Sequence, residues 1–166
     1  MLQACMITIL PLPSKTLGWA INTEKVPREY RSMVDFVARL TILRSSEHEN
    51  CALSIHAVPP KKIQEINRLY RHKDKPTNVL AISADALDIE VPDEITRNLG
   101  DIFICLPIVE AEAKAEEKLF LNHLIHMVVH ATLHLTGHDH ENNYEAKKME
   151  NSERRILSLM GIPDPY

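Results

Sequence analysis

The chain has 166 residues, 45% of them hydrophobic and 25% charged, a composition that excludes intrinsically disordered and fibrous proteins. Its net charge of −4 excludes a generally basic nucleic-acid-binding protein, so any site for an anion has to be local. We expect a single soluble domain over residues 1–166 with no membrane partner, because no run of about 18 apolar residues is present. The three cysteines lie far apart, which predicts buried thiols in a reducing cytoplasm.

Short apolar runs bounded by proline or glycine predict strands, and apolar residues that recur every three or four positions predict helices. The predicted strands, in chain order, span residues 5–10, 51–58, 79–82 and 100–108. The predicted helices span 27–44, 60–70, two segments of 109–135 separated near 118–122, and 144–160. The acidic stretch 85–94 is predicted to be a loop. Together these elements indicate an α+β fold, with a small mixed four-stranded sheet packed against about five helices.

Six of the nine histidines lie between residues 123 and 140. On a single helix, four of them share a stripe of about 80°, namely His123, His126, His130 and His134. A lone histidine is usually a core or capping residue, but four in register favour a binding site. His130 and His134 are one helical turn apart, which lets both imidazoles reach one zinc ion. For His123 and His126 the simpler interpretation is that they line the pocket.

A third ligand follows the end of this helix. Gly137 can adopt a positive φ, end the helix and turn the chain so that His140 reaches the same ion. The spacing of His130, His134 and His140 matches the HExxHxxGxxH zinc motif of metzincin proteases. Ala131 stands where those proteases have their general-base glutamate, so the ligands are kept and the proteolytic base is absent. Three imidazoles leave an open coordination position, which favours a catalytic metal site at this helix end.

Three neighbouring side chains leave the ligand set open. His126, His138 or Asp139 could supply a fourth ligand, which would make the metal site structural. Asp139 is more readily interpreted as a carboxylate that orients a ligand imidazole.

Residues 61–75 form a basic segment, with six lysines and arginines against two acidic residues. Such a run is often only a solvated helix surface. Here Arg71 closes a predicted helix just before a loop with Thr77 and Asn78, so its guanidinium can hold phosphate oxygens in a bidentate manner. If the histidine site and Arg71 lie close together in the fold, a metal ion would face a phosphodiester held by the arginine. Such an arrangement predicts hydrolysis of the phosphodiester.

Four segments together resemble the YbeY family of bacterial endoribonucleases that mature ribosomal RNA. They are YRHKDKPTNVL at 70–80, LGDIFIC at 99–105, HMVVHATLHLTGHDH at 126–140, and the terminal GIPDPY. The resemblance covers most of residues 60–166, whereas residues 1–55 match only in the predicted order of elements. The chain departs from the family at Ala131, His138 and 81–83, where the family usually has glycine, tyrosine and Ser-Phe-Pro.

The resemblance implies one zinc ion per chain on His130, His134 and His140, and a functionally required catalytic arginine at Arg71. It also implies a single-strand-specific endoribonuclease that acts in ribosomal RNA processing, including late maturation of the 16S rRNA 3′ end, and in quality control of the small subunit. The implied partners are single-stranded precursor RNA and the small ribosomal subunit, without a nucleotide cofactor. The basic loop offers four substrate-binding candidates: Lys73, Lys75, Thr77 and Asn78.

Two other functions compete with RNA cleavage. A zinc metalloprotease-like hydrolase would share the ligand spacing, but Ala131 argues against it. A non-enzymatic RNA-binding factor for ribosome assembly would carry a structural zinc, and loss of a ligand would then reduce stability and RNA binding together.

Overall fold

The computed structural model describes residues 19–45, 50–87, 97–138 and 143–166. The elements in this part of the chain are β1 (Ala20–Lys25), α1 (Arg28–Ser45), β2 (Ala52–Ala57), α2 (Pro60–Arg71), β3 (Val79–Ser83), α3 (Ala84–Leu87), β4 (Asn98–Ile104), α4 (Leu106–Ala115), α5 (Phe120–Leu135) and α6 (Asn143–Leu159). The predicted α+β class with a mixed four-stranded sheet is confirmed. Of the six described helices, α3 is only a single turn of four residues.

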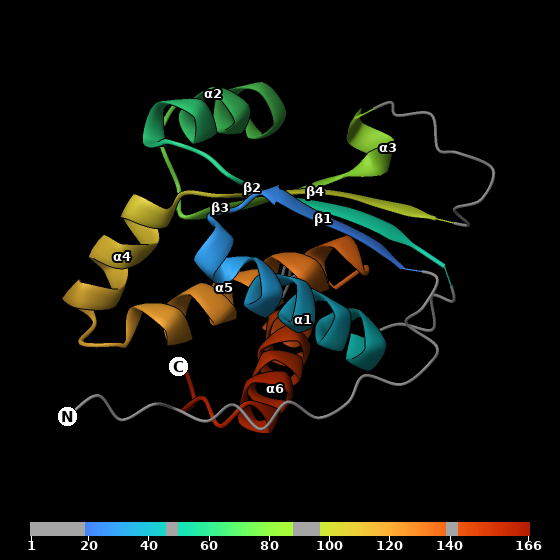
Figure 1. The fold of residues 1–166 in the computed structure, drawn as a ribbon, viewed down its shortest axis with the longest axis vertical. Coiled ribbons are helices and arrows are strands. Elements are labelled where there is room, and N and C mark those ends of the chain that lie inside the picture. Colours follow the sequence, from blue (N-terminus) through green and yellow to red (C-terminus); the bar gives the residue numbers. More distant parts are fainter. Residues whose placement is uncertain (1–18, 46–49, 88–96, 139–142) are drawn as a thin grey trace.

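The strand order is β1-β2-β4-β3. Strands β1, β2 and β4 run parallel, whereas β3 pairs with β4 in the antiparallel direction and forms one edge of the sheet. Helices α1, α5 and α6 lie on one side of the sheet and α2 on the other (Figure 1). No helix in the described part of the chain is long and apolar enough to cross a membrane.

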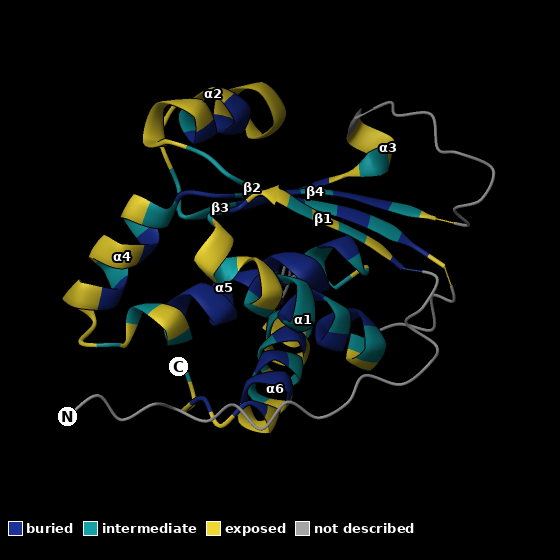
Figure 2. Cartoon of the chain, viewed as in Figure 1, coloured by how far each residue is buried: buried dark blue, intermediate teal, exposed yellow. Residues whose placement is uncertain are grey.

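Two apolar clusters hold these layers together. The larger one joins the sheet to α1, α5 and α6, and it includes the fully buried Ile55, Ile102 and Leu133. The smaller one joins α2 to the opposite face through Ile63 and Ile82. Successive side chains of a strand point to opposite faces, so β3 packs its alternate residues into both clusters. Helix α5 is the most deeply buried helix, whereas α2 keeps an exposed outer surface (Figure 2).

Most predicted elements match the structure within a few residues, but the four strands are not the four that were predicted. The prediction of a strand at 5–10 lies outside the described residues. Strand β1 at Ala20–Lys25 was not predicted, because Ile21 is its only large apolar side chain. This strand is held at the sheet edge by backbone hydrogen bonds to β2, which leave little trace in the sequence.

Two predicted boundaries are wrong. The strand predicted at 100–108 is β4, which spans Asn98–Ile104, and α4 begins at Leu106. Pro107 lies in the first turn of α4, where the missing amide hydrogen is not needed. Helix α3 occupies Ala84–Leu87 and overlaps the start of the predicted acidic loop, and 88–96 lies outside the described residues.

The prediction of buried thiols is confirmed for two cysteines. Cys51 and Cys105 are buried and not in disulfides, and burial raises the pKa of Cys51 to about 11. Cys5 lies outside the described residues.

Candidate metal centre and RNA-binding pocket

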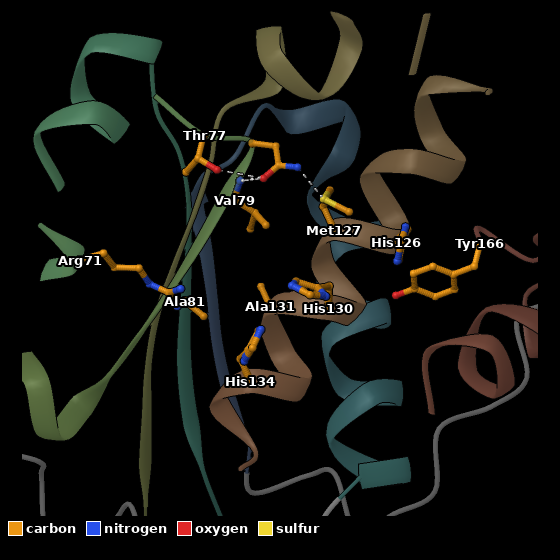
Figure 3. A pocket seen from close by; sticks show the side chains of 11 residues that line it. Arg71, Thr77, Val79, Ala81, His126, Met127, His130, Ala131, His134 and Tyr166 are labelled. Carbon is orange, nitrogen blue, oxygen red and sulfur yellow. Dashed lines mark hydrogen bonds between the residues drawn. The ribbon is translucent and has the colours of Figure 1, made fainter. Parts of the chain in front are cut away.

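A pocket of about 360 Å³ opens between the edge strand β3 and helix α5. Its lining comes from α2, from β3 and the loop before it, from α5, and from Tyr166 near the end of the chain (Figure 3). The lining residues are Arg71, Thr77, Asn78, Val79, Ala81, His126, Met127, His130, Ala131, His134 and Tyr166. The pocket therefore brings Arg71, Thr77 and Asn78 together in space with His130 and His134.

The histidine stripe predicted on one helix is confirmed, because α5 runs without interruption from Phe120 to Leu135. The rings of His130 and His134 lie with their centroids 4.7 Å apart and their planes at 83°. Both rings face the pocket (Figure 3). Farther back, His126 lines the pocket as predicted, whereas His123 is buried and is not among the pocket's lining residues.

Glu153 of α6 is a fully buried carboxylate that is hydrogen-bonded to two of these histidines, His126 and His130. His130 Nδ1 donates to Glu153 Oε1 at 2.7 Å, and His126 Nε2 donates to Oε2 at 3.2 Å. The hydroxyl of Tyr166 donates to the same Oε2 atom. Burial acts to raise the pKa of Glu153, but the hydrogen bonds from His126, His130 and Tyr166 outweigh it and hold the pKa at about 2. The carboxylate therefore stays ionised at neutral pH.

An ionised Glu153 carboxylate can only accept a hydrogen bond, so we infer that Nδ1 of His130 carries a proton. An imidazole that donates from Nδ1 to a carboxylate carries its lone pair on Nε2, the arrangement found in many zinc-binding histidines. With His134 one turn away on the same pocket wall, the donor set fits a zinc ion. No group of three potential metal ligands meets within the described residues, and the predicted third ligand, His140, lies outside them.

The end of α5 has the geometry that the sequence predicts. Gly137 adopts a φ of +92°, and the His138 backbone N–H donates to Leu133 O at 3.0 Å, which closes the last turn. Burial, and secondarily the charge of Lys148, lower the pKa of His138 and so favour its neutral form. Asp139, the other predicted neighbour of the site, lies outside the described residues.

The loop after α2 is fixed by the buried side chain of Asn67. His72 ends α2 in the left-handed conformation with a φ of +56°, and Asn67 Nδ2 donates to Lys75 O at 2.8 Å. This anchoring places the exposed Arg71 at the mouth of the pocket (Figure 3). Lys73 and Lys75 are exposed and do not line the pocket.

Asn78, a candidate RNA-binding residue, already has partners within the protein at both ends of its amide. Its Nδ2 atom donates to Glu112 Oε2 at 3.0 Å and contacts Met127 Sδ at 3.3 Å. Its Oδ1 atom accepts from the Val79 backbone N–H at 2.7 Å. His123 Nε2 donates to Glu112 Oε2 as well, at 2.9 Å, so this network ties the pocket wall to α4 and α5.

The comparisons with known proteins point to one family. The family model described as Endoribonuclease YbeY matches residues 19–161. The chain belongs to the YbeY family. A curated Endoribonuclease YbeY from Chelativorans is 40% identical over 93% of this chain and 94% of its own length. The Vesicomyosocius okutanii relative of the same name is 47% identical over 69% of this chain and 76% of its own length.

The fold is shared with a solved structure. A Thermotoga maritima protein determined in solution superposes with a TM-score of 0.57 at 22% identity, over 86% of this chain and 88% of that one. The predicted resemblance to the YbeY family is thus confirmed by sequence, and the α+β fold by structure.

Three residues of this YbeY-family site were missed in the sequence: Glu112, Glu153 and Tyr166. Glu153 had a detectable signal, because it occupies the buried stripe of α6 between Met149 and Ile156. A carboxylate on an apolar stripe indicates a buried partner. No such pattern marked Glu112 or Tyr166, whose contacts come from distant parts of the chain.

Proposed function

We propose that this member of the YbeY family is a metal-dependent endoribonuclease that hydrolyses phosphodiester bonds in single-stranded RNA. One observation carries the proposal: a single pocket is lined by the Arg71 guanidinium from α2 and by the His130 and His134 imidazoles from α5. Positive charge held beside the phosphate favours phosphodiester hydrolysis, because negative charge grows in the transition state. The names of the curated relatives support the same activity.

The proposed cofactor is one zinc ion per chain, held by His130, His134 and His140. Two of these imidazoles share the pocket, and Gly137 turns the chain at the point where His140 follows. A zinc ion bound there would supply Lewis-acid stabilisation of the charge that develops on the phosphate.

The chain's own groups divide the remaining work. Arg71 is the proposed catalytic residue, which binds a non-bridging phosphate oxygen and stabilises its charge through the reaction. Glu153 keeps the His130 lone pair on Nε2, toward the pocket. Thr77 and Asn78 shape the wall beside Arg71 and are the proposed contacts of the sugar-phosphate backbone. Lys73 and Lys75, which lie outside the pocket, would attract the RNA at longer range.

The finer biological assignment rests on family membership. We propose a cytoplasmic enzyme that acts on ribosomal RNA precursors, including late maturation of the 16S rRNA 3′ end. Its further proposed role is quality control of the small ribosomal subunit, which would be its macromolecular partner. No nucleotide cofactor is required for hydrolysis, because water provides the incoming oxygen.

A protease function is less well supported. Ala131 lies in the pocket wall beside His130, and its methyl group can neither take up nor release a proton. Peptide cleavage at a zinc site of this spacing depends on a base at that position.

The test compares metal content and cleavage of a single-stranded RNA among four proteins at matched concentration and salt. They are the wild type, His134→Ala, Arg71→Glu and the control Arg68→Glu, which changes the same charge on the exposed surface of α2. We expect His134→Ala to lose both zinc and cleavage, and Arg71→Glu to keep zinc but lose most cleavage. Full activity in His134→Ala, or equal losses in the two arginine variants, would overturn the proposal. Loss of RNA binding together with stability in His134→Ala would favour a structural zinc instead.

A further inference from the structure

The last residues of the chain are fastened to the body of the protein at several points. Lys118 Nζ donates to Pro165 O at 2.9 Å, and Arg154 Nε donates to Asp164 Oδ2 at 3.0 Å. The Arg154 guanidinium also lies over the Tyr166 ring, 4.8 Å from its centroid. Residues 162–166, called the C-terminal strap below, therefore have a defined path across α6 and the α4–α5 turn.

The strap delivers Tyr166 to the pocket. The Tyr166 ring packs edge-on against His126 with centroids 5.6 Å apart, and it lines the pocket (Figure 3). Although 56% of the residue is exposed, its hydroxyl points inward and donates to Glu153 Oε2. No other hydroxyl is hydrogen-bonded to this carboxylate within the described part of the chain.

We propose that Tyr166 is a positioning residue of the metal centre, which fixes the Glu153 carboxylate and thereby the orientation of the His130 imidazole. The proposal rests on the proposed function, because it concerns the same metal site. With this role for Tyr166, the C-terminal strap becomes a part of the proposed metal centre.

The geometry explains how Tyr166 would act at a distance. Glu153 uses Oε1 for His130 and Oε2 for both His126 and Tyr166. Two donors on Oε2 restrain rotation of the carboxylate about its terminal bond, so Oε1 remains in line with His130 Nδ1. Without the Tyr166 hydroxyl, only His126 holds Oε2, and at 3.2 Å its hydrogen bond is longer than that of His130. The His130 ring would then have more freedom to turn.

The test measures zinc affinity by competition with a chelator in full-length protein. Replacing an outer partner of a zinc-binding histidine typically weakens metal binding by about 10- to 100-fold, which we expect for Glu153→Gln. For Tyr166→Phe, one contact farther away, we expect a loss of about threefold to tenfold. The matched control is Tyr30→Phe, which removes the same hydroxyl from a partly buried tyrosine on α1, outside the pocket.

A second readout needs no metal. In the metal-free protein, imidazole nitrogen NMR should show His130 as the Nδ1-protonated tautomer in the wild type and in Tyr30→Phe. Tyr166→Phe should show a mixture of tautomers or ring exchange at His130. A general loss of stability would not select this one ring.

The possible outcomes separate the two proposals. If the wild type binds no zinc, the proposed function fails, while the tautomer measurement still tests the role of Tyr166. If Tyr166→Phe binds zinc as tightly as Tyr30→Phe and keeps the His130 tautomer, the positioning role is refuted and the proposed function stands. Should Glu153→Gln fail to fold, Tyr166→Phe alone decides, since it removes one oxygen atom and keeps the ring.

Discussion

Two carboxylates hold the histidine stripe of α5 from different sides, and they differ in burial. Glu153 of α6 is fully buried and receives hydrogen bonds from His130, His126 and Tyr166. Glu112 of α4 has a side chain that is 35% exposed, and its hydrogen bonds come from His123 and Asn78. A hydrogen bond between a carboxylate and an imidazole thus occurs at a fully buried position and at a partly exposed one.

The difference indicates two separate tasks. Water can replace a lost partner at Glu112, so that network works mainly as a tether between the pocket wall and the helices. Glu153 has no exposed surface and its hydrogen-bond partners are protein groups, which is why we propose that the orientation of His130 depends on it. Burial therefore leaves Glu153 with protein partners alone, whereas Glu112 is also open to solvent.

The largest expected effect comes from removing each carboxylate in turn. Glu153→Ala leaves buried imidazole donors unpaired and opens a cavity, so we expect the free energy of unfolding to fall by about 3 kcal/mol. Glu112→Ala should lower it by only about 1 kcal/mol, because solvent can reach the donors that remain. Urea denaturation of both variants in metal-free buffer measures the two losses. Equal losses would remove the distinction between the two sites.

A smaller effect is expected when the tether itself is cut. Asn78→Ala removes the donor to Glu112 and the acceptor of the Val79 backbone N–H, which should lower the free energy of unfolding by about 1.5 kcal/mol. The control Thr77→Val removes a single hydroxyl that donates to Asn78 at 3.2 Å, with an expected loss of about 0.5 kcal/mol. If Asn78→Ala abolished RNA cleavage without any loss of stability, Asn78 would act through its proposed RNA contact and not as a tether.

The smallest expected effect is a titration difference at Tyr166, whose hydroxyl donates to the buried carboxylate of Glu153. Burial and the neighbouring Glu153 charge raise the pKa of Tyr166 above its ordinary value of 10. Its contribution to stability is therefore complete below pH 10 and is lost as the pH rises further, because the unfolded chain releases the phenol proton first.

Tyrosinate absorbance checks this difference by comparing the wild type with Tyr166→Phe. In the folded proteins the rise in absorbance near pH 10 should be the same for both, since Tyr166 does not yet ionise there. In denaturant the wild type should show the larger rise. A larger rise in the folded wild type would mean that the hydroxyl is not held by Glu153.

The sequence predicted the features that depend on local periodicity. The helix that carries His130 and His134, its end at Gly137 and the position of Arg71 before a loop all follow from spacing and from residues that favour turns. The family resemblance rests partly on those same segments, at 70–80 and 126–140. Strand β1 was not predictable in this way, because its pairing with β2 uses backbone groups that every residue has.

The supporting contacts of the site could not be derived from spacing. Tyr166 is 13 positions from Glu153 in the sequence, and Glu112 is 34 positions from Asn78. Such contacts depend on how helices cross, which a pattern within one helix does not encode. Only Glu153 could have been recognised from the sequence, because it is a charged residue within an apolar stripe of α6.

The position of Tyr166 in the pocket wall bears on how the protein should be handled at the bench. An affinity tag fused after Tyr166 would begin at the residue whose ring packs against His126, with ring centroids 5.6 Å apart. A polyhistidine tag placed there would bring competing imidazoles to the mouth of the cavity that His130 and His134 line, and would distort measurements of bound metal.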